Sequence, residues 1–207
     1  MDYWNHNAAY HPMIVSTAAG LGGDVLDVGC GEGLLVERLA TVSRTVTGVD
    51  RDGRALGRAA VRTAGLANTS LVEVDFLEFA SAPGSYDLIT MVAVLHHLDL
   101  TAGLCRSAAL LRPGGQLLVV GLSANKSMGD YVRSAVLLPL VRGLSVLHHG
   151  NRAVQVVAVP PTESFAEIRE MARHLLPGVR LRRALYYRYI LAWTKPASSE
   201  SNLPVTG

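Results

Sequence analysis

Val25-Leu26-Asp27-Val28-Gly29-Cys30-Gly31-Glu32-Gly33 is a short apolar run that leads into a glycine loop. The run predicts a buried strand, and glycine allows the backbone to turn sharply and to approach a ligand without an intervening Cβ. In a dinucleotide site the glycines follow G-x-G-x-x-G, with the pyrophosphate on the N-terminus of the next helix. Here the third glycine comes one residue early, so the loop departs from the NAD pattern.

Asp27 places a carboxylate inside the end of this strand, two residues before the first glycine. Beside a bound pyrophosphate this carboxylate would be repelled, whereas a ligand ammonium group would attract it. The charge therefore favours a cationic amino-acid ligand.

Apolar, β-rich runs alternate with helical patterns over the first 121 residues, which favours a parallel sheet covered by helices on both faces. The expected strands are 24–28, 45–50, 70–74, 86–91 and 116–121, and the expected helices are 33–42, 54–64, one capped by Thr101 and ended by residues 112–115, and 165–176. The runs Val179 to Tyr187 and Tyr189 to Thr194 lie too close together for a helical crossover. They are predicted to form an antiparallel pair.

The length of 207 residues and the 49% hydrophobic composition are typical of one domain with an insertion. We expect a single domain over 1–196 and a disordered tail over 197–207. Residues 1–19 would form an N-terminal cap helix, and 122–160 a lid inserted after the fifth strand. Extra core packing or a dimer face are the alternatives for this apolar insertion.

Nineteen basic and seventeen acidic residues give a formal charge of +2, without a pattern suited to nucleic acid. Cys30 and Cys105 lie far apart, so neither a disulfide framework nor a zinc site is predicted, and no metal is proposed. The N-terminus does not resemble a secretory signal, and the insertion is too interrupted for a membrane span. We expect a cytoplasmic monomer or homodimer.

Two further carboxylates follow predicted strands. Asp50 ends the second strand, where ribose hydroxyls are commonly held, and Asp75 follows the third, where it could accept from an adenine amino group. The neighbouring Phe76 could line the base pocket. Each signal is weak alone because acidic residues are common in turns, but the three carboxylates together favour an adenosine ligand.

With these motifs on residues 26–33, 50 and 75–76, the sequence resembles the class I S-adenosylmethionine-dependent methyltransferases. Residues 86–89, 94–97 and 110–115 match further motifs of that family, and the resemblance covers roughly 20–121 and 162–196. It implies an α/β fold, a Rossmann-like three-layer sandwich with a seven-stranded, mostly parallel sheet whose last strand is antiparallel. It also implies direct SN2 transfer of a methyl group from S-adenosyl-L-methionine to oxygen, nitrogen or carbon of a small, partly apolar molecule, leaving S-adenosyl-L-homocysteine.

The resemblance and the strand ends together suggest the site residues. The expected cofactor-binding residues are Tyr10, Asp27, Gly29, Cys30, Gly31, Gly33, Asp50, Arg51, Asp75, Phe76, Met91 and Val92. The expected substrate residues are Tyr3, Trp4, His97 and Tyr131, and the candidate catalytic residues are His96 and His6.

Histidine is the natural base near neutral pH, but methyl transfer from a sulfonium does not require one. Adjacent His96 and His97 are expected to diverge, so at most one would face the substrate while the other packs. Alternatively, both hold the loop. The N-terminal aromatics and His6 could form a wall over the methyl group or merely anchor the terminus. A non-catalytic S-adenosylmethionine-binding scaffold is the second functional hypothesis, and an NAD(P)-dependent oxidoreductase is the third.

Overall fold

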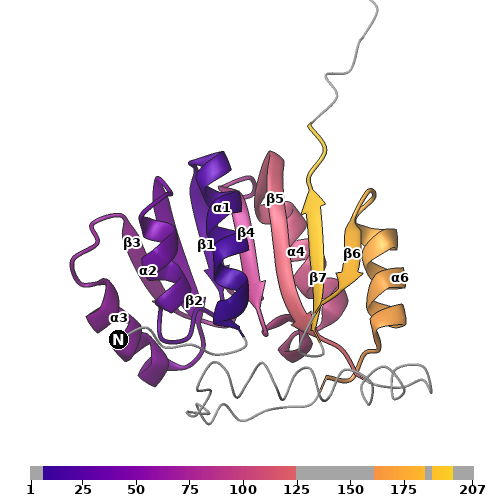
Figure 1. Cartoon of the computed structure of the whole chain (residues 1–207), viewed down its shortest axis with the longest axis horizontal. Coiled ribbons are helices and arrows are strands. Elements are labelled where there is room, and N and C mark those ends of the chain that lie inside the picture. Colours follow the sequence, from indigo (N-terminus) through magenta and orange to yellow (C-terminus); the bar gives the residue numbers. More distant parts are fainter. Residues whose placement is uncertain (1–6, 125–160, 185–187, 198–207) are drawn as a thin grey trace, which may run out of the picture.

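A computed structural model describes residues 7–124, 161–184 and 188–197, and a seven-stranded sheet forms its centre (Figure 1). The sheet order is β3-β2-β1-β4-β5-β7-β6. The strands are β1 (Asp24–Val28), β2 (Thr45–Asp50), β3 (Thr69–Glu73), β4 (Tyr86–Val92), β5 (Leu111–Leu122), β6 (Arg180–Arg183) and β7 (Arg188–Thr194).

The strands from β3 to β5 pair in parallel, while β7 runs antiparallel between β5 and β6. This confirms the predicted sheet and the antiparallel pair near the end of the chain. Because β7 reverses direction, it begins at the edge where the parallel strands end, and Arg188 lies opposite Leu122.

Helices cover both faces of the sheet, as the alternating pattern predicts. On one face α1 contacts α2 and β4, and α2 contacts α3, while α4 and α6 contact each other in the other layer. The helices are α1 (His11–Leu21), α2 (Leu34–Ala40), α3 (Gly53–Thr63), α4 (Leu100–Leu110) and α6 (Phe165–Leu175), with 3-10 turns η1 (Ala8–Tyr10) and η2 (Leu95–His97).

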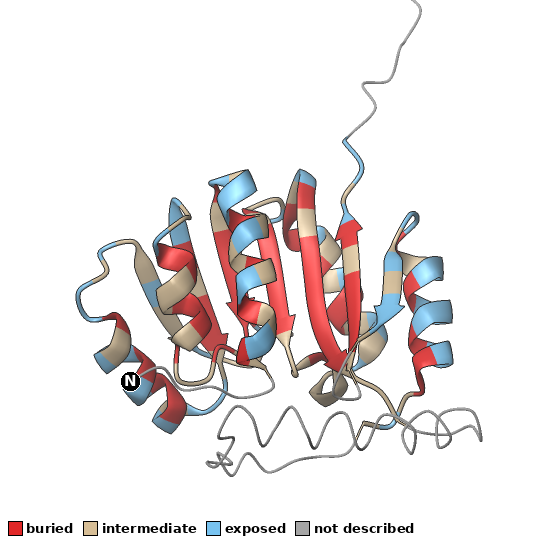
Figure 2. Cartoon of the chain, in the orientation of Figure 1, coloured by how far each residue is buried: buried red, intermediate tan, exposed pale blue. Residues whose placement is uncertain are grey.

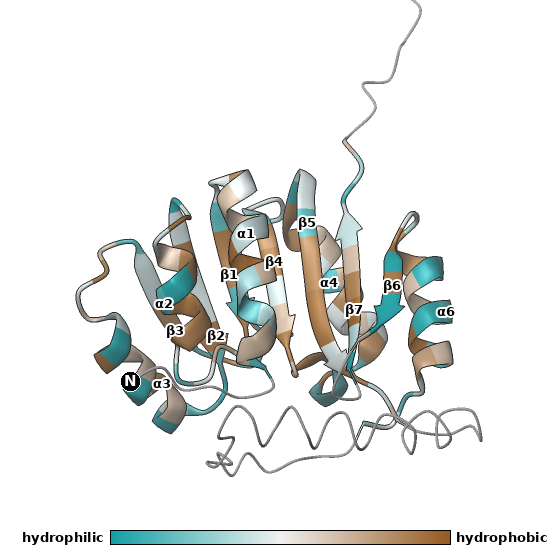
Figure 3. Ribbon diagram, viewed as in Figure 1, coloured by the Kyte–Doolittle hydropathy of each residue, from teal (hydrophilic) through white to brown (hydrophobic). Residues whose placement is uncertain are grey.

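Alternation along the strands supplies a separate apolar core to each layer. In β1, Val25 packs with Ile14 of α1, whereas its neighbour Leu26 belongs to the core that contains Leu104 of α4. Successive side chains of a strand point to opposite faces, so the central strands must be apolar on both. Figures 2 and 3 show this result as buried, largely hydrophobic central strands.

Two local expectations are corrected. Helix α4 is capped by Asp99, whose side chain accepts from the Ala102 N–H at 2.7 Å, so Thr101 lies inside the helix. Residues 112–115 end α4 as predicted but already belong to β5, which starts five residues earlier than expected, at Leu111. The pairing with β4 shifts register there, and Gly114 instead donates to the Lys195 carbonyl at 2.8 Å.

The N-terminal region contributes to the core where it is described. Ile14 and Ala18 of α1 are fully buried, so α1 covers the sheet. Residues 1–6, most of the expected lid at 122–160 and the expected tail beyond 197 lie outside the described residues. Within the described ranges, no helix has the length and apolar character needed to cross a membrane.

Candidate functional site

The glycine loop between β1 and α2 is tied to the end of β2 by its backbone. The N–H groups of Gly29 and Cys30 both donate to the Val49 carbonyl, at 2.7 and 3.1 Å. Gly29, Gly31 and Gly33 have φ values of +68°, +53° and +76°, which side-chain-bearing residues rarely adopt. The predicted loop is therefore confirmed as a left-handed turn at the carboxyl edge of the sheet.

The absence of a side chain has different consequences at Gly29 and at Gly31. A Cβ at Gly29 would lie 2.2 Å from Cγ2 of Val94, in the segment that follows β4. A Cβ at Gly31 would meet nothing within 4 Å. Gly29 thus permits packing within the protein, whereas the backbone at Gly31 is open to a ligand.

Asp50 braces this loop. Its carboxylate accepts from the Gly31 N–H at 2.8 Å and from the Asp52 N–H at 2.9 Å. Each carboxylate oxygen has a second lone pair, so these bonds leave acceptor capacity for ribose hydroxyls. Arg51, the next residue, is exposed.

Asp27 is buried at the end of β1, with 2% of its surface exposed. Its Oδ1 accepts from the Thr90 hydroxyl of β4 at 2.7 Å. Burial raises the pKa of Asp27 to about 7, the Thr90 bond acts against this, and the nearby Asp50 carboxylate raises it further. The group is thus poised to ionise when a cation approaches.

The residues after β3 and within β4 are less accessible to a cofactor than expected. Asp75 Oδ1 accepts from the Leu77 N–H at 2.8 Å, which closes a tight turn. Phe76 is only 4% exposed and packs in the core, so its ring offers little surface to a base. Met91 is fully buried, while the following Val92 is half-buried. Cys30 is buried as well, and a Cβ at Gly48 would lie 2.9 Å from its Sγ.

The segment after β4 contains a strained residue that the sequence did not indicate. Ala93 has φ of +59° and donates its N–H to the Val120 carbonyl of β5 at 2.8 Å. Strain of this kind at a non-glycine residue is concentrated at functional sites. It turns the chain toward the glycine loop, where Val94 packs against Gly29.

The two histidines of η2 do not diverge as expected. Their ring centroids are 4.0 Å apart with an interplanar angle of 39°, so the two side chains lie side by side. Burial, then His97 and Arg188, lowers the pKa of His96 to about 4 against the opposing effect of Glu163, and its Nδ1 is buried without a hydrogen-bond partner in the described structure. Burial, followed by Arg51, also lowers the pKa of His97.

Sequence reasoning missed Arg188, because Arg180, Arg182, Arg183 and Arg188 form one local group of basic residues in the chain. Three of that group, Arg180, Arg182 and Arg183, are exposed on the edge strand β6. In contrast, Nε and Nη1 of Arg188 are buried, and no partner for either is found among the described residues. The one available signal was its position directly before the apolar run of β7.

Arg188 and Tyr10 extend the site beyond β4. Burial lowers the pKa of Arg188, and Tyr10 of η1 acts in the opposite direction. The effect of Arg188 on His96 links this pair to η2. Tyr3, Trp4, His6 and Tyr131, the other expected substrate or catalytic residues, lie outside the described residues.

The chain is similar to known methyltransferases in sequence and in fold. Residues 25–115 match the model of a family described as a methyltransferase domain. An uncharacterised methyltransferase of Mycobacterium tuberculosis strain H37Rv is 32% identical over 197 residues, which cover 93% of this chain and 98% of the relative. A ubiquinone biosynthesis O-methyltransferase of Ralstonia nicotianae is 35% identical over 133 residues, covering 56% of this chain and 54% of that protein.

A solved structure shares the architecture. The N-methyltransferase NodS from Bradyrhizobium japonicum WM9, crystallised in complex with S-adenosyl-L-homocysteine, aligns with a TM-score of 0.64 and 22% identity over 93% of this chain and 89% of NodS. The full-length similarity to a methyltransferase, the seven-stranded sheet with a reversed β7 and the glycine loop agree with one another. The chain therefore belongs to the class I S-adenosylmethionine-dependent methyltransferases.

Proposed function

We propose that this enzyme binds S-adenosylmethionine across the ends of β1, β2 and β4 and transfers its methyl group to a small molecule. The open backbone at Gly31, between Asp27 and Asp50, carries this proposal. A cationic amino-acid group suits the buried Asp27 carboxylate, and a ribose suits the remaining acceptor capacity of Asp50.

When bound, the cofactor supplies a methyl group already activated by a sulfonium. The work of the protein is therefore to position the acceptor and to exclude water. The turn at Ala93 and the packing of Val94 on Gly29 join the β4 segment to the glycine loop. This contact would fix the position of the acceptor relative to the cofactor.

His96 is proposed as the base for acceptors that lose a proton. Its pKa, lowered to about 4, keeps the imidazole unprotonated at neutral pH but also makes it a weaker base than an ordinary histidine. The buried Nδ1 has no partner in the described structure and is the atom that could accept the proton. For a hydroxyl acceptor, the O–C bond forms as the C–S bond breaks, the electron pair of that bond goes to sulfur, and the hydroxyl proton goes to the imidazole. His97 would position the turn from its place beside Arg51.

Calorimetry with S-adenosylmethionine, S-adenosylhomocysteine and NADH tests the cofactor assignment. We expect both sulfur ligands to bind at one site and NADH not to bind. Asp50→Ala should weaken binding by about 1–3 kcal/mol, the usual loss for a hydrogen bond to a charged group. Parent-like binding by Asp50→Ala would contradict the ribose assignment.

Turnover over a panel of small hydroxyl, amine and carbon acceptors tests catalysis. Transfer of labelled methyl to any of them supports the proposal, and the nature of the acceptor identifies the nucleophile. Tight cofactor binding without turnover across a broad panel would instead favour the non-catalytic scaffold.

A further inference from the structure

The half-buried Arg188 stands at the start of β7, at the carboxyl edge of the sheet. Two guanidinium nitrogens of Arg188, Nε and Nη1, are shielded from solvent and have no hydrogen-bond partner among the described residues. Burying an unpaired ionised group is costly, so such a group is normally compensated by a counter-charge. By contrast, Arg44, Arg58, Arg62 and Arg112 each form an ion pair with a carboxylate of the described chain.

The position of Arg188 separates it from the cofactor side. The strand order β1-β4-β5-β7 places three strand spacings between the glycine loop and the start of β7. At about 4.8 Å per spacing this is roughly 14 Å. Ala93, after β4, donates to Val120 of β5, and Arg188 lies opposite Leu122 of β5. The turn with His96 and the start of β7 therefore flank the same end of β5.

Among the described residues, no carboxylate is found to act on the guanidinium of Arg188. Glu163 influences His96 and Tyr189, but the groups that affect Arg188 are its own burial and Tyr10. A phenol hydroxyl is a weaker partner for a guanidinium than a carboxylate is. A second unsatisfied atom, Nδ1 of His96, faces the same need for a polar partner.

We infer that the methyl acceptor carries a carboxylate, and that Arg188 is the residue that selects it. This inference rests on the proposed function, because it concerns the acceptor of that same site. A carboxylate would supply the missing charge and accept hydrogen bonds from the buried guanidinium. The group of the acceptor that receives the methyl would then lie on the same side of the site as His96.

The first experiment uses the unmodified protein saturated with S-adenosylhomocysteine. Calorimetry compares benzoate with benzamide and octanoate with octanamide, pairs that differ little in size. We expect at least one acid to bind about 10- to 100-fold more tightly than its amide, as a hydrogen-bonded charge pair predicts. Equal binding within both pairs would overturn the inference.

The second experiment uses Arg188→Met, with Arg182→Met on the exposed strand β6 as the matched control. Arg188→Met should abolish the preference for acids over amides, while Arg182→Met should retain it and both should bind S-adenosylhomocysteine normally. If Arg188→Met weakens S-adenosylhomocysteine to the same degree, Arg188 serves the cofactor and the inference is wrong. If that variant does not fold, the acid–amide comparison on the parent protein still decides.

The two proposals fail separately. A parent protein that binds S-adenosylhomocysteine but shows no preference for acids over amides contradicts only the carboxylate inference. Failure of the parent protein to bind S-adenosylhomocysteine contradicts the proposed function itself.

Discussion

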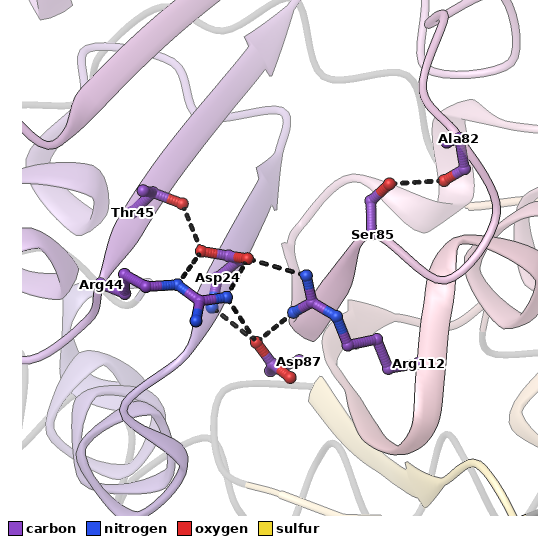
Figure 4. Close-up of polar contacts among 7 residues, drawn as sticks. All are labelled: Asp24, Arg44, Thr45, Ala82, Ser85, Asp87 and Arg112. Carbon is purple, nitrogen blue, oxygen red and sulfur yellow. Dashed lines mark hydrogen bonds and ion pairs between the residues drawn. The ribbon is translucent and has the colours of Figure 1, made fainter.

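Charged side chains are paired at the end of the sheet where the parallel strands begin, and largely unpaired in the described structure at the end where those strands finish. At the edge where the parallel strands begin, Asp24 and Asp87 are surrounded by Arg44 and Arg112 (Figure 4). Asp24 accepts from Arg44 Nε at 2.8 Å and from Arg112 Nη2 at 2.9 Å, and Asp87 accepts from the Asp24 N–H at 2.7 Å. These bonds, that of Arg44 first, hold the pKa of Asp24 well below its usual range.

At the opposite edge, charged and polar groups are buried without such matching. Asp27 sits close to another carboxylate, and the described structure provides no partner for two nitrogens of Arg188 or for Nδ1 of His96. A balanced network stabilises the folded chain, whereas unmatched groups are retained at a site that receives a ligand. The contrast identifies the second edge as functional and leads to four predictions.

The largest expected effect comes from closing the open backbone at the functional edge. Gly31→Val should lower the affinity for S-adenosylmethionine more than about 100-fold, because a branched side chain would occupy the ligand's place. Gly84→Val is the control, since Gly84 also has positive φ (+68°) and open space around its Cβ. Both variants should lose similar stability in urea, but only Gly31→Val should lose binding. Equal binding by the two would contradict the assignment of the loop.

Substitutions in the network of Asp24, Asp87, Arg44 and Arg112 should lower stability without changing cofactor binding. Asp87→Ala removes the acceptor of the Asp24 N–H and the partner of Arg112, so the free energy of unfolding should fall by about 1–3 kcal/mol. Urea unfolding measures the loss, and calorimetry should show unchanged affinity for S-adenosylmethionine. A loss of affinity in the folded variant would mean that the two edges are not independent.

The next effect is a pH dependence of cofactor binding through Asp27. With a pKa of about 7, Asp27 is protonated below that pH and must release its proton to pair with a cation. Affinity should therefore fall about tenfold per unit as the pH drops from 7 to 5.5. Asp27→Asn should bind weakly with little dependence on pH in this range.

The raised pKa of Asp27 has the opposite effect on the stability of the protein without ligand, which should fall as the pH rises. Because the folded-state pKa of Asp27 exceeds the ordinary value of 3.8, the folded state binds more protons between these values. Its contribution to stability declines as the pH rises from about 4 to about 7. A parent protein whose affinity is flat from pH 7 to 5.5 would show that Asp27 does not meet the cation.

The smallest expected effect is a gain in stability. Arg188→Met replaces a buried guanidinium by an apolar side chain of similar length, so unfolding in urea should require about 1 kcal/mol more. Arg182→Met on the exposed strand should change stability by less than about 0.5 kcal/mol. A loss of stability in Arg188→Met would indicate that the cation is compensated in the folded protein after all.

Much of the fold was predictable because its signals are local. The apolar alternation of β1, the capping box of Ser164 and Glu167, and the short connection before β7 each depend on residues close together in the chain. The start of α4 was misplaced because Thr101 and Asp99 can both cap a helix. The early start of β5 depends on pairing with β4, which no local pattern reveals.

The sequence by itself determined the class of protein, the glycine loop and the carboxylates that end β1 and β2, since turn chemistry and strand periodicity are properties of neighbouring residues. Only the tertiary structure decided that Asp50 braces Gly31 and that the rings of His96 and His97 approach each other. It also decided that two guanidinium nitrogens of Arg188 are shielded from solvent while Arg182 is exposed. The physical reason is that burial and charge pairing depend on which strands lie side by side. Reversing β7 brings an arginine from the end of the chain to the edge where β4 and β5 finish.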